Sequence, residues 1–268
     1  MEYDPIKRSL GKVFNSAPFL RKLFYGLLDL LLLRTWHVKK EIRDWSQSHT
    51  GKADILDAGM GFGQYSYFLS GFNKNWKIRG VDVKEEQIAD CINFFGKTGR
   101  TNASFSFADL TAFSEPSAYD FILSVDVMEH ILDDTAVFRN FHSSLREGGM
   151  VLISTPSDQG GSDVHDHEEG SFIEEHVRDG YNIFEIQDKL KASGFSRTEA
   201  RYQYGKPGQV SWRLSMKYPI LMLGVSKLFF IILPFYYLIT FPLSLILNYA
   251  DVNGKHKTGT GLIVKAWK

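Results

Sequence analysis

Asp54-Ile55-Leu56-Asp57-Ala58-Gly59-Met60-Gly61-Phe62-Gly63 is the stretch of sequence that decides the fold. It predicts a short buried strand that runs into a loop with glycine at every second position. The periodic apolar side chains of Tyr65, Phe68 and Leu69 follow and indicate a helix. A strand, a glycine turn and a helix N-terminus favour a nucleotide pocket, because glycine lets the backbone approach a ligand and first-turn amides attract polar or negative groups.

The glycine spacing narrows the kind of nucleotide. A dinucleotide fingerprint needs Gly-x-Gly-x-x-Gly, but here the third glycine comes one residue early and Gln64 stands in its place. A phosphate-binding Walker loop would end in Gly-Lys-Ser/Thr, which the sequence lacks. The remaining pattern is Asp-x-Gly-x-Gly-x-Gly, for which a plain tight turn stays open as the simpler interpretation.

Composition bounds the class of protein. The 268 residues suit one α/β domain with extra elements, or one domain and a small appendage. The formal net charge is zero, so we expect no nucleic-acid partner, which usually requires a basic field. The single cysteine, Cys91, cannot form an internal disulfide and indicates a reducing cytosol.

Three predicted strands after the loop each end in a carboxylate. The strand over 77–83 carries Asp82, nineteen residues beyond Gly63, about where an α/β nucleotide fold places an acid against ribose hydroxyls. The alternative role for Asp82 is to cap the next helix. The strand over 104–110 ends at Asp109. The alternative is that Asp109 is a simple turn residue and binds no ligand. The strand over 119–126 is nearly continuously apolar, as a central parallel strand should be, and ends at Asp126.

The order of the later motifs is more specific than any one of them. Tyr119-Asp120-x-Ile122-x-Ser124-x-Asp126-Val127-x-Glu129-His130-Ile131 precedes a predicted helix, Leu145-x-x-Gly148-Gly149 and the strand Ile153-Ser154-Thr155-Pro156. With the glycine loop, this order resembles the UbiE/UbiG-like (methyltransferase type 11) branch of the class I methyltransferases that use S-adenosylmethionine. The resemblance covers residues 53–194. It implies a Rossmann-like, doubly wound sheet of seven strands with the last strand antiparallel, and S-adenosylmethionine as the cofactor.

The resemblance also assigns cofactor-binding residues. Gly59, Gly61 and Gly63 are expected along the methionine and ribose side, and Asp57 is expected to hold the loop and the cofactor's amino group. The remaining acids follow the cofactor from ribose to adenine to sulfonium, in the order Asp82, Asp109 and Asp126. Methyl transfer is a displacement with an excellent leaving group, so positioning supplies much of the rate and a strong base is optional.

The catalytic base stays unassigned, with three weak candidates. His130 follows Glu129, and some ubiquinone O-methyltransferases use acids near this motif for a divalent metal, although a structural role for Glu129-His130 is favoured and no metal is predicted. His165 lies in a His/Asp/Glu cluster over 163–169 that is more typical of solvated polar chain than of a zinc site. His176-Val177-Arg178 resembles the His-x-Arg segment that shapes the family's substrate side.

Two apolar segments stand out from the rest of the chain. Residues 19–33 form an amphipathic helix in a predicted N-terminal helical cap over 1–50; it either covers the domain's own pocket, the favoured interpretation, or lies in a membrane interface. Its apolar face holds Phe19, Leu20, Leu23, Phe24, Leu27, Leu28 and Leu31. The second segment, 228–247, is twenty residues without a charge, long enough at about 1.5 Å per residue to cross a hydrocarbon core of roughly 30 Å.

A single crossing is nevertheless excluded by the sequence that follows. Residues 261–267 predict the last, antiparallel strand, paired with a strand near 197–204, so both ends of the apolar segment lie on one side of any membrane. Pro234 and Pro242 are expected to break the segment into short helical pieces. We therefore predict a hydrophobic helical insertion over 214–250 in a methyltransferase core of 51–213 and 251–268. The insertion either enters one bilayer leaflet monotopically or packs against the 19–33 helix over the active site, and an internal core or a dimer interface stays open as the simpler interpretation.

These features predict methyl transfer from S-adenosylmethionine to a hydrophobic acceptor: a lipid, a quinone-type phenol, or a polyene or polyketide intermediate. We expect a cytoplasmic protein at the membrane surface, bound peripherally or monotopically. One alternative is a methyltransferase for a soluble small molecule or a sugar, with the insertion used for dimerisation. Another is a non-catalytic cofactor-binding or membrane-scaffold protein. Gln64 and the lack of a nicotinamide-side motif disfavour a dehydrogenase.

Overall fold

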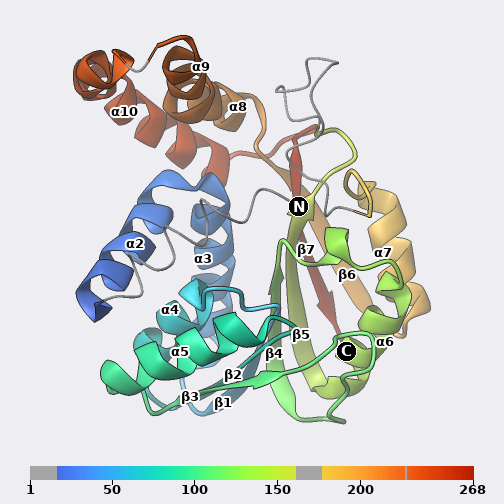
Figure 1. The fold of residues 1–268 in the computed structure, drawn as a ribbon. Coiled ribbons are helices and arrows are strands. Elements are labelled where there is room, and N and C mark those ends of the chain that lie inside the picture. The colour runs from blue at the N-terminus through green and yellow to red at the C-terminus, as the bar shows by residue number, and fades with distance from the viewer. Residues whose placement is uncertain (1–16, 161–176, 227) are drawn as a thin grey trace.

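A seven-stranded sheet with the order β3-β2-β1-β4-β5-β7-β6 forms the centre of the molecule (Figure 1). The computed structural model describes residues 17–160, 177–226 and 228–268. The strands are β1 Ala53–Ala58, β2 Trp76–Asp82, β3 Ala103–Phe107, β4 Tyr119–Val125, β5 Leu145–Pro156, β6 Arg197–Gln203 and β7 Gly261–Trp267. Strands β1 to β5 pair in parallel, and β7 runs antiparallel to both β5 and β6. The predicted fold class is confirmed.

Helices cover both faces of the sheet. On one face lie α3 (Leu33–Ser46), α4 (Gln64–Phe72) and α5 (Glu85–Lys97), and on the other lie α6 (Asp134–Ser144) and α7 (Ile183–Ala192) (Figure 1). Phe121, Ile122 and Leu123 of β4 are fully buried because each face of this strand meets a helix layer. This explains the continuous apolar run in the sequence of β4.

The order of the strands determines where a ligand binds. The chain winds from β1 toward β3 and then returns to β4 on the other side of β1. At such a switch point the loops that follow β1 and β4 diverge and leave a crevice at the carboxyl edge of the sheet. Gly59, Asp82 and Asp126 follow or end β1, β2 and β4 and therefore meet at this edge.

The first described helix, α2 (Pro18–Leu31), packs through its polar face. Arg21 and Tyr25 are its buried residues, whereas Phe19 on the apolar face is 72% exposed. The other exposed apolar side chains are Leu23, Leu27, Leu30 and Leu31. The predicted amphipathic helix is present, but the face that it turns to the domain is opposite to that of an ordinary surface helix.

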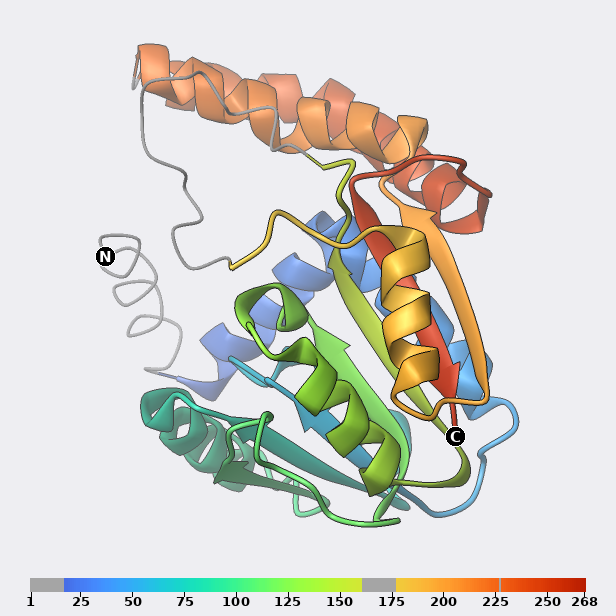
Figure 2. The same cartoon turned by 90° about the vertical axis from the view of Figure 1, so that its right-hand side faces the viewer.

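A helical hairpin, residues 206–253, lies between β6 and β7. Its first arm is α8 (Lys206–Trp212), a π-helical turn (Arg213–Lys217) and α9 (Tyr218–Val225), and its second arm is α10 (Phe229–Asn253). Figure 2 shows the hairpin extending along the top of the molecule, above the carboxyl ends of the parallel strands. The first arm follows β6 and the second arm leads into β7. Since β6 pairs with β7, both arms connect to neighbouring strands, as the sequence predicts.

Helix α10 corrects one expectation. The prediction that Pro234 and Pro242 break the apolar segment is wrong, because α10 runs through both prolines for 25 residues. Each proline removes only one backbone donor, and packing of α10 against α8 and the π-helical turn maintains the remaining helix. By length and composition alone, α10 is the one helix of the described residues that could cross a membrane.

Candidate active site

The glycine loop adopts a backbone that other residues tolerate poorly. Gly59, Gly61 and Gly63 have φ values of +76°, +52° and +71°, in the left-handed region that favours glycine. A Cβ atom on Gly59 would lie 2.3 Å from Cγ2 of Val127, so this position also excludes a side chain by contact. The loop is fixed to β2 because the amides of Gly59 and Met60 both donate to the Val81 carbonyl, at 2.9 and 3.0 Å.

Asp82 connects this loop to the next helix. Its Oδ2 accepts from the Gly61 amide at 2.9 Å, and its Oδ1 accepts from the Lys84 amide, also at 2.9 Å. The helix-capping role is not observed, because the N-cap of α5 is Lys84 and no side chain caps this helix. A carboxylate has about four lone-pair sites, and only two are used here. The free sites leave Asp82 able to accept from two ribose hydroxyls.

Asp57 lies beneath the loop and is fully enclosed. The Ser66 hydroxyl donates to its Oδ2 at 2.6 Å, which fixes the end of β1 to α4. Burial raises the pKa of Asp57 to about 6, while the hydrogen bonds from Ser66 oppose this shift. Asp57 thus supports the loop from within the core and carries its proton in mildly acidic solution.

Asp109 follows β3 and is exposed at the same edge. Its Oδ1 accepts from the Thr111 hydroxyl at 2.7 Å and the Thr111 amide at 2.9 Å, and these bonds lower its pKa. The carboxylate is held by its own turn, and the residue is exposed. It is placed to accept from an amino group.

Asp126 brings in a residue that the sequence did not single out. Its backbone has a left-handed φ of +51°, and its carboxylate forms an ion pair with Arg34, the second residue of α3. The Nε atom of Arg34 is buried and has no hydrogen-bond partner among the described residues. Arg34 is 25 residues before the first loop glycine, and nothing in its spacing marked it; only the packing of α3 against the sheet brings it to the end of β4.

Glu129 and His130 do not form a metal site with Asp126. Glu129 is buried and accepts from the Thr155 hydroxyl at 3.1 Å; burial raises its pKa. His130 is exposed on the short 3₁₀ turn that follows β4. Within residues 17–160, 177–226 and 228–268, no three His, Cys, Asp or Glu side chains are placed to hold a metal ion. His165 and His176 lie outside the described residues.

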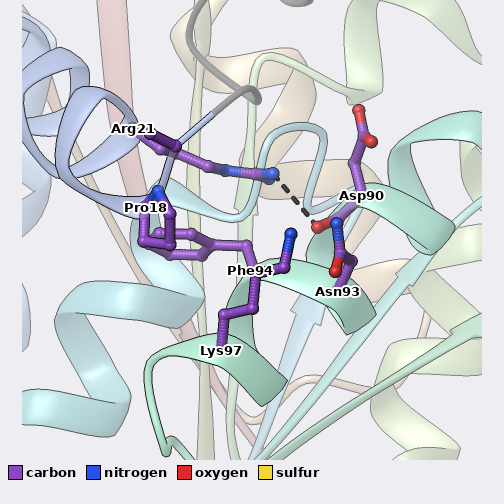
Figure 3. Close-up of a pocket in the computed structure, with 7 residues that line it drawn as sticks. Pro18, Arg21, Asp90, Asn93, Phe94 and Lys97 are labelled. Carbon is purple, nitrogen blue, oxygen red and sulfur yellow. Dashed lines mark hydrogen bonds between the residues drawn. The ribbon is translucent and has the colours of Figure 1, made fainter.

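The polar face of α2 clamps the glycine loop from outside. Tyr25 donates its hydroxyl to the Phe62 carbonyl, and Arg21 donates to the same carbonyl at 2.8 Å. Figure 3 shows Arg21 crossing a shallow hollow at the junction of α2 and α5, where it donates to the Asp90 carbonyl at 3.1 Å. The guanidinium also lies 4.8 Å from the ring centre of Phe94. The N-terminal helix therefore fixes the loop through charge and hydrogen bonds.

Comparisons with known proteins agree with this geometry. The family described as "Methyltransferase domain" matches residues 21–200. Phosphoethanolamine N-methyltransferase of Triticum aestivum is 29% identical over 143 residues, 53% of this chain and 27% of the relative. Ubiquinone biosynthesis O-methyltransferase of Leptothrix cholodnii is 24% identical over 117 residues, 42% of this chain and 49% of the relative. The matches thus span about a quarter to a half of these curated relatives.

Among solved structures, phosphoethanolamine N-methyltransferase 2 of Haemonchus contortus in complex with S-adenosyl-L-methionine shares the fold. Its TM-score is 0.57 at 18% identity, covering 81% of this chain and 49% of that chain. At 18% identity, the structural similarity shows a shared fold. The family match covers residues 21–200, more than half of this chain.

Proposed function

The chain belongs to the class I S-adenosylmethionine-dependent methyltransferase family, and from this premise we propose that it methylates a hydrophobic small molecule at a membrane surface. The observation that carries the proposal is the meeting of the glycine loop, Asp82 and Asp126 at one sheet edge, with an apolar hairpin above that edge.

The residues at the edge fit the parts of S-adenosylmethionine. Gly61 leaves room for a ligand against the backbone, since the nearest atom to a Cβ there would be Oε1 of Gln87 at 3.7 Å. The two open lone-pair sites of Asp82 suit ribose hydroxyls, and Asp109 suits the adenine amino group. Arg34 and Asp126, which pair with each other at the end of β4, carry the charges that would hold the cofactor's carboxylate and its sulfonium. When bound, the cofactor would supply an activated methyl group for displacement by the acceptor.

The protein's contribution is to position and to exclude water. Methyl transfer has an excellent leaving group, so positioning of the acceptor supplies much of the rate and a strong base is optional. Glu129 is the nearest buried acid in sequence, and its hydrogen bond with Thr155 fixes the loop after β4. His130, His165 and His176 remain candidates for acceptor contacts.

The hydrophobic acceptor is supported by the surfaces around the edge. Relatives in the family are named for acceptors as different as phosphoethanolamine and a ubiquinone precursor, so membership leaves the acceptor open. The exposed apolar faces of α2 and of the hairpin, both next to the carboxyl edge, favour a lipid or another apolar molecule taken from the cytoplasmic face of a membrane.

The experiment is methyl transfer from methyl-tritiated S-adenosylmethionine to two pools, a total lipid extract in detergent micelles and an aqueous metabolite extract. We expect label in the organic phase with the wild type and the exposed-surface control Asp188→Asn, and none with Asp82→Ala. Label in the aqueous pool alone would support the soluble-acceptor alternative. No label, together with no binding of S-adenosylhomocysteine, would leave a non-catalytic protein as the remaining interpretation.

A further inference from the structure

The outer half of the hairpin, residues 218–237, exposes apolar side chains on both of its arms. The 33 residues from Tyr218 to Ala250 contain a single charged residue, Lys227. Side chains on both sides of the tip are between 51% and 82% exposed: Val225, Leu228, Phe230, Ile231, Ile232 and Phe235. Such a surface is stable only if something apolar covers it.

The width of this surface decides what covers it. At about 100° per residue, the side chains of Phe230, Ile231 and Ile232 span roughly 200° around α10. A partner helix, including one from a second copy of this chain, covers only a narrow seam along one side. Lipid chains surround a helix evenly, so the exposed arc favours a bilayer over a protein partner.

The backbone of the hairpin is adapted to an apolar environment at its most irregular point. Pro219 has no amide hydrogen, so the Ser215 carbonyl loses its helical donor. The Tyr237 hydroxyl replaces it, donating to that carbonyl at 2.9 Å, and the Tyr236 hydroxyl donates to the Leu214 carbonyl at 2.8 Å. These bonds join α10 to the π-helical turn and supply partners that water would otherwise provide; in hydrocarbon, a missing partner costs several kcal/mol.

The charged residues at the tip and at the base set the depth. Lys227 is at the tip in the sequence, and a lysine is costly at the bilayer centre, so the tip stays short of the midplane. Helix α9 has eight residues between Lys217 and the tip, about 12 Å at the usual helical rise, whereas one leaflet is about 15 Å of a 30 Å core. Arg213 and Lys217 would then lie at the level of the lipid phosphates. We propose that the outer half of the hairpin, residues 218–237, inserts tip first into one bilayer leaflet as a monotopic anchor. This inference rests on the proposed membrane association.

The base of the hairpin connects the anchor to the active site. Asp251, fully buried near the end of α10, bonds His37 of α3 at 2.8 Å and accepts from the Gly208 amide of α8 at 2.9 Å. Because Arg201 donates to Nδ1 of His37 at 2.9 Å, the other ring nitrogen donates to Asp251. Arg34 lies in the first turn of α3, so these bonds connect the base of the inserted hairpin to the carboxyl edge of the sheet.

The first test measures depth. Full-length protein with Cys91→Ser carries one environment-sensitive fluorophore at position 231, 249 or 184, and binds vesicles of phosphatidylcholine and phosphatidylglycerol with spin labels at several acyl depths. We expect position 231 to be quenched by the deepest labels. Position 249, about 18 Å beyond the end of the anchor along α10, and position 184 on α7 should be quenched by none. Equal depth at 231 and 249, or quenching from the far leaflet at 231, would overturn tip-first insertion.

The second test uses the native cysteine background. Ile231→Lys and its matched control Phe184→Lys each place a charge at an apolar side chain of similar exposure, 69% and 73%. We expect Ile231→Lys to weaken vesicle flotation at least tenfold and Phe184→Lys to leave it unchanged. Binding of S-adenosylhomocysteine is measured on the same samples. If the wild type binds S-adenosylhomocysteine but does not float with vesicles, the anchor is refuted and the methyltransferase function stands. If the wild type floats but does not bind this ligand, the methyltransferase function is refuted and the anchor stands.

Discussion

The Gly61 amide donates a 2.9 Å hydrogen bond to Oδ2 of Asp82, so the tip of the glycine loop and the end of β2 are fixed to each other. A single carboxylate thereby sets the loop and presents itself to the ligand. Asp82→Asn keeps an acceptor for Gly61 but loses the charge, whereas Asp82→Ala loses both. We expect affinity for S-adenosylhomocysteine to fall about tenfold in the first variant and up to about 100-fold in the second, from charged hydrogen bonds of about 1.5–3 kcal/mol.

Isothermal titration calorimetry measures this affinity, with Asp188→Asn as the exposed control on α7. Unchanged affinity in Asp82→Ala would refute the ribose assignment. A thermal melt of each variant shows whether loss of the Gly61 contact also unfolds the loop.

Gly59→Ala should harm the protein more than Gly99→Ala. Both positions have positive φ, +76° and +67°, so each substitution costs roughly 1–2 kcal/mol of backbone strain. Only at Gly59 does the new methyl group meet a neighbour, Val127, and the forced contact adds about 1–3 kcal/mol. Denaturant unfolding measures the difference, and Val127→Ala in the Gly59→Ala background should recover part of it. Equal losses at the two glycines would mean that Val127 yields freely.

Arg34→Ala should separate two ligands that share adenosine. S-Adenosylhomocysteine carries the amino-acid group, and methylthioadenosine lacks it. We expect at least tenfold weaker binding of the first and unchanged binding of the second, with partial recovery in Arg34→Lys, since lysine keeps the charge but not the planar fork. Arg43→Ala, exposed on the same helix, is the control. Equal weakening of both ligands would reveal a purely structural arginine.

Asp57 should make the folded state less stable as pH rises through its titration. Its folded pKa, about 6, lies above the ordinary 3.8, so the folded state binds the proton more tightly than the unfolded chain. The resulting stabilisation is present below pH 4 and is lost between pH 4 and 6, by about 3 kcal/mol at 1.36 kcal/mol per pKa unit. Other carboxylates titrate in the same window, so the measurement is the difference in unfolding free energy between wild type and Asp57→Asn. A difference that does not change with pH would contradict the buried, raised pKa.

Much of the fold was predictable because the strongest signals are local. The run Tyr119–Val125 has to be buried on both sides, and a glycine at every second position after β1 has to form a tight loop. Once the strands are known to be parallel, their carboxyl ends must share an edge, which places Asp82, Asp109 and Asp126 together without coordinates. The helix break expected at Pro234 and Pro242 failed because a proline removes one hydrogen bond, and neighbouring packing can exceed that loss.

The sequence by itself determined the sheet, the glycine loop and the order of the strand-end acids, because these follow from periodicity, backbone freedom and chain direction. Only the tertiary structure decided which face of α2 is buried and that Arg34 pairs with Asp126. It also decided that the hydroxyls of Tyr236 and Tyr237 on α10 bond to the π-helical turn of the first arm. Each of these depends on contacts between elements distant in the chain, where the energy of a pair is set by geometry. An apolar stripe in a sequence indicates a surface that packs against another apolar surface. Only the fold shows whether that second surface belongs to the same chain.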